Sequence, residues 1–336
     1  MENSNKIIPP HLNAEVYRTD TTGACSISYL DYIRLHPDDG ILIGCSELTG
    51  RYWNGGANLY KSVTEAQRSH SNEKRAISLT SGTADGCFVG NPSKVLLCED
   101  SGAISIWTVS HNDSWKQWSE EKSVAEHDDS VLAVDCLQSE KEYVTAGADG
   151  NIKVWDINEM ICIRNYLAAH SLAIHGVVVR PSSSACFATG SLDYSVTLWD
   201  ENVSQPVLDL AKNSCGVRCL QWTDENSLIY GDEAGVMYLV DARKPETTIK
   251  LCEFPAAIHK LVVHTEAHKV AVCCDNKIVS VCELNENATQ KVIYHDRHMH
   301  TNYVRDAAWD LMESKTLHTV GWDGEIKSHN ITWDCE

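Results

Sequence analysis

The sequence predicts an all-β fold, a single seven-bladed β-propeller in which similar four-stranded sheets form a ring. Three observations predict it. Three segments align with one another, weaker copies fill the intervals between them, and apolar residues alternate with polar ones inside each copy. Repeats of about 40 to 50 residues built from alternating strands are typical of propellers.

The three clearest copies share an opening His, a later Thr, and an Asp four residues after that Thr. They cover residues 127–156, 170–200 and 300–330. The Asp follows the opening His after 22 or 23 residues, as from His127 to Asp149. A spacing this regular indicates that the copies are internal repeats with one shared structure.

The fainter copies complete the ring. Equivalent positions near the end of each copy are 60, 107, 155, 199, 240, 282 and 329, which are 41 to 48 residues apart. Seven such positions predict seven blades and leave no room for a second domain. We expect residues 26–336 to form the propeller and residues 1–25 to form a partly ordered N-terminal extension. An open ring would leave unpaired strand edges, so we expect a strand from residues near 12–30 to complete the blade of 300–330.

This pattern resembles the WD-repeat family over nearly the whole chain. The resemblance implies a buried hydrogen-bonded network of His, Thr, Asp and Trp within a blade. The expected networks are His127, Thr145, Asp149 and Trp155, then His170, Thr189, Asp193 and Trp199, and finally His300, Thr319 and Asp323 with His329 in place of the Trp. Buried polar groups are tolerated when each satisfies another. A catalytic triad would occur once, whereas these residues recur in blade after blade, which favours a structural role.

Composition narrows the function. The 43% apolar content fits a protein with a sizeable core, and 47 acidic against 28 basic side chains give a net charge of −19. Such a surface favours basic partners and repels nucleic acid, so no direct nucleic-acid binding is expected. No apolar run is long enough for a membrane span, the N-terminus lacks the apolar core of a secretory signal, and the 14 cysteines contain no C-x-x-C. We therefore expect a cytoplasmic protein with reduced cysteines and no membrane contact.

Motifs of catalysis and cofactor binding are not found. The chain contains no G-x-S-x-G, G-x-x-x-x-G-K-S/T, H-E-x-x-H or G-x-G-x-x-G. The stretch "HDRHMH", with His295, His298 and His300, suggests a metal site at first, but a frame of further ligands is missing and His300 belongs to a predicted network. We expect no enzyme activity, no cofactor and no metal.

The stretch "GRYWNGG", residues 50–56, is unusual. Its glycines predict a loop rather than the interior of a strand, yet it carries Arg51, Tyr52 and Trp53. Trp, Tyr and Arg are enriched at binding hot spots, so a loop that pushes the indole outward would suit a protein interface. The alternative is that both aromatic rings tuck under the first blade, and the residues alone leave this open.

A further resemblance favours the interface. The segments "SELTGRYWNGGANLYK", "CEDSGAISIWTV", "GDEAGVMYLVD", "HTNYVRDAAW" and "TVGWDGEIKSH" resemble the WD-repeat subunit of the methylosome, and insect members of that family are the nearest description. The resemblance implies a non-catalytic adaptor that binds a symmetric (type II) protein arginine methyltransferase through Arg51, Tyr52 and Trp53, with Tyr294 as a second aromatic contact. It also implies Arg/Gly-rich substrates such as Sm proteins, histone tails and Piwi-type proteins, association with Tudor-domain proteins, and a presence in the nucleus and germ granules.

Two other functions stay open at this stage. Val240-Asp241-Ala242-Arg243 approximates the W-D-x-R box of substrate receptors for cullin-type ubiquitin ligases, without its Trp. A generic propeller scaffold in RNA processing is the other alternative, which the net charge disfavours.

Overall fold

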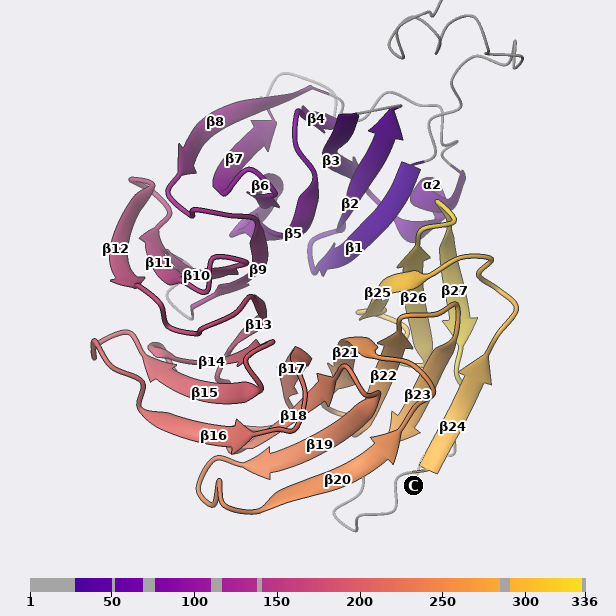
Figure 1. Ribbon diagram of the computed structural model, residues 1–336. Helices are drawn as coiled ribbons and strands as arrows, with labels where there is room; N and C mark the ends of the chain where they lie inside the picture. The colour runs from indigo at the N-terminus through magenta and orange to yellow at the C-terminus, as the bar shows by residue number, and fades with distance from the viewer. Residues whose placement is uncertain are drawn as a thin grey trace, which may run out of the picture.

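The computed structural model describes residues 28–49, 52–68, 76–109, 117–137, 141–284 and 291–333. These residues form seven antiparallel sheets arranged in a ring (Figure 1). The predicted all-β, seven-bladed propeller is therefore confirmed, and the seven positions found by repeat counting all fall on the third strand of successive blades. The expected N-terminal extension of residues 1–25 lies outside the described residues.

Each blade is a meander, because strands that follow one another in the chain pair as neighbours in the sheet. In chain order the blades comprise β1 (Ser28–His36), β2 (Gly40–Thr49), β3 (Tyr52–Tyr60) and β4 (Ile77–Leu79); β5 (Thr83–Val89), β6 (Asn91–Glu99), β7 (Ala103–Val109) and β8 (Trp118–Ala125); β9 (Val131–Cys136), β10 (Glu142–Gly147), β11 (Ile152–Asp156) and β12 (Ile161–Tyr166); β13 (Ile174–Val179), β14 (Cys186–Ser191), β15 (Ser195–Asp200) and β16 (Leu208–Lys212); β17 (Val217–Trp222), β18 (Ser227–Asp232), β19 (Val236–Asp241) and β20 (Thr248–Glu253); β21 (Ile258–His264), β22 (Lys269–Cys274), β23 (Val279–Glu283) and β24 (Lys291–Asp296); β25 (Val304–Trp309), β26 (Thr316–Gly321) and β27 (Ile326–Asn330).

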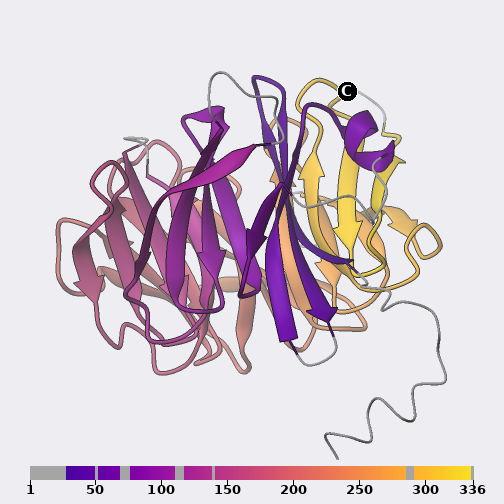
Figure 2. The same ribbon diagram turned by 90° about the horizontal axis from the view of Figure 1, so that it is seen from above.

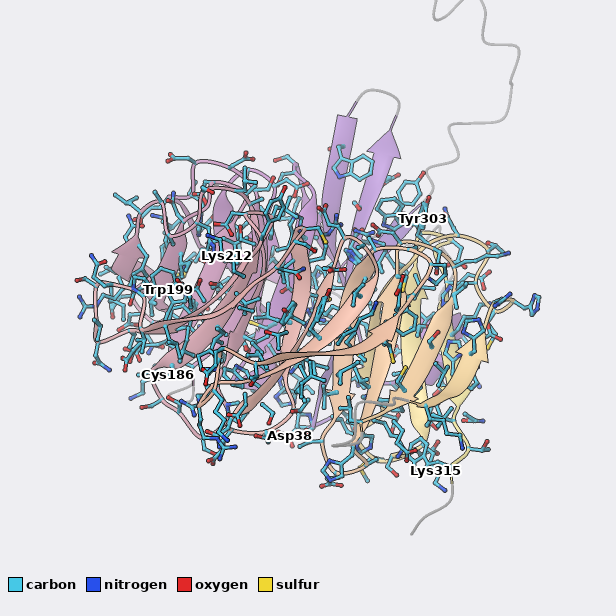
Figure 3. All side chains as sticks on the ribbon, turned by 60° about the horizontal axis from the view of Figure 1, so that its bottom comes forward. Asp38, Cys186, Trp199, Lys212, Tyr303 and Lys315 are labelled. Carbon is cyan, nitrogen blue, oxygen red and sulfur yellow. The ribbon has the colours of Figure 1, made fainter. Side chains whose placement is uncertain are left out.

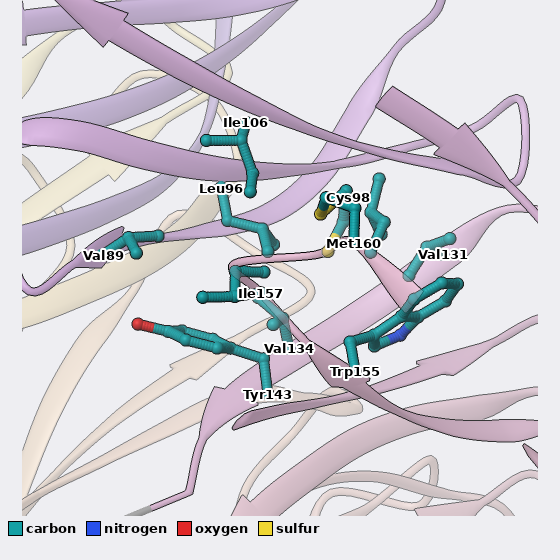
Figure 4. Close-up of a cluster of buried hydrophobic side chains, with 11 residues drawn as sticks. Val89, Leu96, Cys98, Ile106, Val131, Val134, Tyr143, Trp155, Ile157 and Met160 are labelled. Carbon is teal, nitrogen blue, oxygen red and sulfur yellow. The ribbon is translucent and has the colours of Figure 1, made fainter. Parts of the chain in front are cut away.

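The core lies between neighbouring blades. Figure 4 shows the cluster between blades two and three, where Leu96 and Ile106 of one blade lie with Val134, Tyr143 and Trp155 of the next. Trp155 is fully buried. Similar clusters join the other blades around the ring, so each sheet buries apolar side chains against both neighbours.

The ring meets at a seam between blades seven and one. Strand β1 packs against β25 and β26. The backbone N–H of Ile33 donates to Asp306 at 3.2 Å, and Arg34 forms ion pairs with both Asp306 and Asp85. The two contacts with Asp306 join residues more than 270 positions apart in the chain.

The last blade has three strands among the described residues. Residues 28–30, the described part of the segment expected to complete that blade, instead begin β1 and pair with β2 in blade one. The rest of that segment lies outside the described residues. A short helix, α2 (Val63–Arg68), lies beside β27, and Gln67 Nε2 donates to Ser328 Oγ at 2.9 Å. In the described ranges no helix is long and apolar enough to cross a membrane.

One expectation about secondary structure is wrong. Residues 52–56 of "GRYWNGG" are not a loop but the start of β3, with Trp53 opposite Leu48 of β2. Glycine is used here for close approach, since a Cβ on Gly55 would lie 2.5 Å from the carbonyl oxygen of Ser81. Figure 2 shows the ring from its edge, and in the tilted view of Figure 3 the hairpin made by the long pairing of β2 with β3 stands out at the top.

Candidate protein-binding site

In the buried networks each side chain donates a hydrogen bond to the next one, so the bonds run in a single direction. In blade three, Trp155 Nε1 donates to Thr145 Oγ1 at 2.8 Å, and Thr145 lies 2.9 Å from His127 Nε2. His127 Nδ1 is 2.9 Å from Asp149. Indole can only donate and an ionised carboxylate can only accept, so each group in the chain gives one proton to the next. Burial lowers the pKa of His127, which keeps the ring neutral as this chain requires.

Blades four and seven contain the other two expected networks. His170 lies 2.9 Å from Asp193 and 2.8 Å from Thr189, which accepts a hydrogen bond from Trp199. In blade seven, His300 lies 2.9 Å from Asp323 and 2.7 Å from Thr319. These residues are engaged with one another, as a structural role requires.

In the last blade His329 stands where the other blades have Trp. Its Nε2 lies 2.8 Å from Thr319 Oγ1, and its Nδ1 lies 2.9 Å from the hydroxyl of Tyr294. To act as a donor like indole, His329 must carry its proton on Nε2, and a hydroxyl donating to Nδ1 selects that tautomer. Burial lowers the pKa of His329 to about 4, so the ring stays neutral.

Tyr294, expected as the second interface aromatic, is thus placed inside a blade network on β24. Its ring meets that of His329, whereas the ring of Trp53 stacks on Tyr29. The expected role of Tyr294 at an interface stays a prediction. His295 accepts a hydrogen bond from Arg297, and the described residues contain no group of three or more His, Cys, Asp or Glu placed to hold a metal.

Trp53 lies on the β2–β3 hairpin and is the first ring in a row of aromatic rings at the seam. Its indole is 42% exposed and stacks on Tyr29, with ring centroids 6.0 Å apart and planes 12° apart. Tyr29 meets Trp322 edge to face at 5.7 Å, and Trp322 meets Tyr303 at 5.7 Å. We call Trp53, Tyr29, Trp322 and Tyr303 the seam aromatics. Tyr303 is 43% exposed, so the row has a solvent-facing ring at each end.

Charged and polar side chains support the row of seam aromatics. The guanidinium of Arg305 lies 4.5 Å from the centroid of Trp322, and Trp322 Nε1 donates to Asp31 at 2.9 Å. Ser46 also donates to Asp31. Burial raises the pKa of Asp31 to about 6, although both hydrogen bonds oppose that shift. The position of Trp53 depends on Gly82, where a Cβ would come within 2.8 Å of the indole nitrogen.

The exposed indole favours the outward-facing alternative over a ring tucked under the first blade. Arg51 lies outside the described residues, and so does the side chain of Tyr52. Sequence reasoning missed Tyr29, Tyr303, Trp322 and Arg305 as parts of this site. "HTNYVRDAAW" and "TVGWDGEIKSH" carry three of them, but only the fold brings these motifs to the first blade. Nothing in the sequence around Tyr29 marks it.

Comparison with known proteins agrees with this architecture. The family model described as "WD domain, G-beta repeat" matches residues 118–156, which span the last strand of blade two and most of blade three. The chain is thus a seven-bladed β-propeller with a segment that matches the WD-repeat model. It is similar to "Methylosome protein WDR77" of Xenopus laevis, with 24% identity over 94% of this chain and 93% of that protein. This similarity supports the resemblance to methylosome WD-repeat subunits.

Other similar proteins match over shorter stretches. "Nuclear distribution protein nudF" of Emericella nidulans is 22% identical over 66% of this chain and 49% of its own length. "U3 small nucleolar RNA-associated protein 15" of Schizosaccharomyces pombe is 22% identical over 63% of this chain and 42% of its own length.

Proposed function

We propose that this chain is a non-catalytic adaptor of a methylosome-type complex, and that its seam aromatics bind a type II protein arginine methyltransferase. The observation that carries the proposal is the exposed Trp53 on the β2–β3 hairpin, supported from behind by Tyr29. The similarity to a methylosome protein along nearly the whole chain supports a role in such a complex, and the choice of a type II methyltransferase as the partner rests on the family resemblance.

The geometry suits a hot spot. A tryptophan fixed by stacking loses little conformational freedom when it binds, and its ring removes a large apolar area from water. Tyr303, at the other end of the row, offers a second exposed ring on the same face. Figure 3 labels it near the foot of the β2–β3 hairpin. A partner that covers both rings would bury a continuous aromatic strip.

The charge of the chain suggests its role toward substrates. With a net charge of −19, the propeller would attract Arg/Gly-rich segments such as those of Sm proteins, histone tails and Piwi-type proteins. Attraction raises the local concentration of substrate beside the catalytic partner without chemistry by the propeller itself. We extend this proposal to association with Tudor-domain proteins, and to work in the cytoplasm, the nucleus and germ granules.

The decisive experiment is Trp53→Ala. We expect the complex with the methyltransferase to weaken by more than about 2 kcal/mol, close to a thirtyfold rise in the dissociation constant. Calorimetric titration of the purified proteins measures it, and thermal unfolding of the variant should differ little from wild type. Tyr194→Ala is a matched control, because Tyr194 is 46% exposed but lies in blade four, away from the seam.

An unchanged affinity together with a lower unfolding temperature would show that the indole serves the fold and would refute the interface. The ubiquitin-ligase alternative makes a different prediction, namely binding of a ligase adaptor and of no methyltransferase. In the structure Arg243, the basic residue of the approximate W-D-x-R box, is paired with Asp241 of the same box at 2.7 Å.

A further inference from the structure

The innermost strand of every blade contains a β-bulge at the same place. In each case the pairing between the innermost strand and the next strand skips one residue of the innermost strand, which is left unpaired. These residues are Asp31, Ala84, Leu132, His175, Arg218, His259 and Arg305. All seven line the central channel. Bulges redirect side chains, and here they aim one side chain per blade into the channel.

The basic side chains among the seven bulge residues all lie on one side of the ring. Blades four to seven contribute His175, Arg218, His259 and Arg305 in succession, whereas blades one to three contribute Asp31, Ala84 and Leu132. The innermost strands of blades four to seven pack side by side. One sector of the channel therefore gathers two guanidinium and two imidazole groups, which we call the cationic sector.

A single carboxylate bridges this sector. Asp275 lies 3.2 Å from Arg305 and 3.8 Å from both Arg218 and His259. Glu233 is 3.7 Å from Arg218 but 43% exposed, so water screens it. Asp31 also faces Arg305, but its oxygens accept hydrogen bonds from Ser46 and Trp322. The neighbouring Lys260 is 4.0 Å from Asp306.

Hydrogen bonding in the sector is incomplete. Nδ1 of His259 is buried and has no hydrogen-bond partner among the described residues. Its distance of 3.8 Å to Asp275 is too long for a hydrogen bond. An unsatisfied buried polar atom is uncommon and calls for a partner. The guanidiniums of Arg218 and Arg305 are about one fifth exposed, so a small ligand can reach them.

The electrostatic environment favours an anion. Burial lowers the pKa of His175 to about 4, and the positive charges of Arg218 and Arg305 contribute to that shift. The pKa of His259 is lowered well below its usual value by burial, and next by the same two arginines. Both rings thus lie in a positive local potential, although the chain as a whole is strongly acidic.

We propose that the cationic sector is a binding site for a phosphate-type oxyanion, held by Arg218 and Arg305 with His175 and His259 as further hydrogen-bond partners. Guanidinium groups bind tetrahedral oxyanions through paired N–H donors. The site lies in the channel and uses none of the exposed rings. Because Arg305 also touches Trp322, an anion bound there is in contact with the support of the seam aromatics.

Titration of the full-length protein with inorganic phosphate tests the proposal. We expect binding with a dissociation constant of about 1 mM or tighter at low ionic strength. Arg218→Gln should weaken it at least about tenfold, because a charge-assisted contact is lost. Asp275→Asn should strengthen it about threefold to tenfold, because the competing carboxylate is removed. A disturbed fold would not improve affinity, so the gain separates a site from structural damage.

Arg180→Gln is the control, since Arg180 stacks on Trp222 outside the channel, and it should leave binding unchanged. A phosphoserine peptide that competes with inorganic phosphate would identify a modified side chain as the source of the oxyanion. Binding of inorganic phosphate alone would identify the free ion, and either result supports the site. Absence of binding, or binding that ignores both channel substitutions, would overturn it. No methyltransferase is needed, so the outcome is independent of the proposed function.

Discussion

Two tryptophans in this propeller have opposite surroundings. Trp155 in blade three is fully buried, and its indole nitrogen begins a closed chain of hydrogen bonds through Thr145 to Asp149. Trp53 at the seam is 42% exposed and stacks on Tyr29. The network of blade three satisfies its own polar groups, whereas the seam leaves aromatic surface facing solvent.

This contrast indicates which aromatic side chains of the propeller are free to contact a partner. The aromatic and polar groups of a buried network are already engaged with one another, so these groups are not available to a partner. The seam is held by other means, namely the contacts of Asp306 with Ile33 and Arg34 and the bond from Trp322 to Asp31. Its outer aromatic rings remain available for binding.

The largest effect we expect comes from breaking the closed network. Asp149 accepts hydrogen bonds from His127, from the backbone of Asp128 and from Asn151. Asp149→Ala leaves these donors without a partner and should lower the free energy of unfolding by about 3 to 5 kcal/mol. Denaturant unfolding measures the loss, and affinity for the methyltransferase should be unchanged.

Asp128→Ala controls for the loss of a carboxylate, because Asp128 is exposed beside the same network, and it should change stability by less than about 0.5 kcal/mol. If Asp149→Ala cost no more than this control, the network would not be what stabilises blade three.

The closed networks could be predicted from sequence because their chemistry imposes a spacing. His, Thr and Asp must meet at the turns of one blade, and a repeated blade repeats their separation along the chain. The seven blades follow from the same regularity. The seam could not be predicted in this way. It joins Tyr29 to Trp322 and Tyr303, residues nearly a whole chain apart, through contacts that occur once.

The expected loop around Trp53 was wrong for a local reason, whereas the expected role of Tyr294 stays untested. Glycines usually mark loops, but Gly55 is needed where its strand passes close to the backbone of Ser81 and Gly82. Tyr294 lies just before the last blade, and its role at the interface rests on the family resemblance and stays a prediction. In the structure its hydroxyl contacts His329 across the boundary of blades six and seven, a pairing that requires both blades to be in place.

The stability of the folded protein should also depend on pH through Asp31 at the seam. Because the pKa of Asp31 rises from 3.8 to about 6 on folding, the native state binds this proton more tightly than the unfolded chain does. Asp31 therefore favours folding below pH about 4, and that contribution is lost as the pH rises through 6. Relative to Asp31→Asn, the wild type should lose about 3 kcal/mol of stability between pH 4 and pH 7.

Denaturant unfolding of both proteins across this range measures the difference, and it cancels the titration of the many other carboxylates. The groups facing Asp31 are Ser46, Trp322, Arg305 and Asp100. Parallel stability curves for the two proteins would mean that Asp31 titrates alike in the folded and unfolded chain.

The smallest expected effect concerns Tyr294. Its measurement shows whether this residue serves the buried network or the binding interface. Removal of the hydroxyl in Tyr294→Phe deprives His329 Nδ1 of its donor, so the tautomer that donates to Thr319 is no longer selected. We expect a loss of about 1 kcal/mol in the free energy of unfolding and no change in affinity for the methyltransferase. Because Phe keeps the ring, packing against the last blade is preserved and the measurement isolates the hydroxyl. A weaker complex at unchanged stability would instead place Tyr294 in the interface, as the family resemblance implies, and would extend the binding surface beyond the seam aromatics.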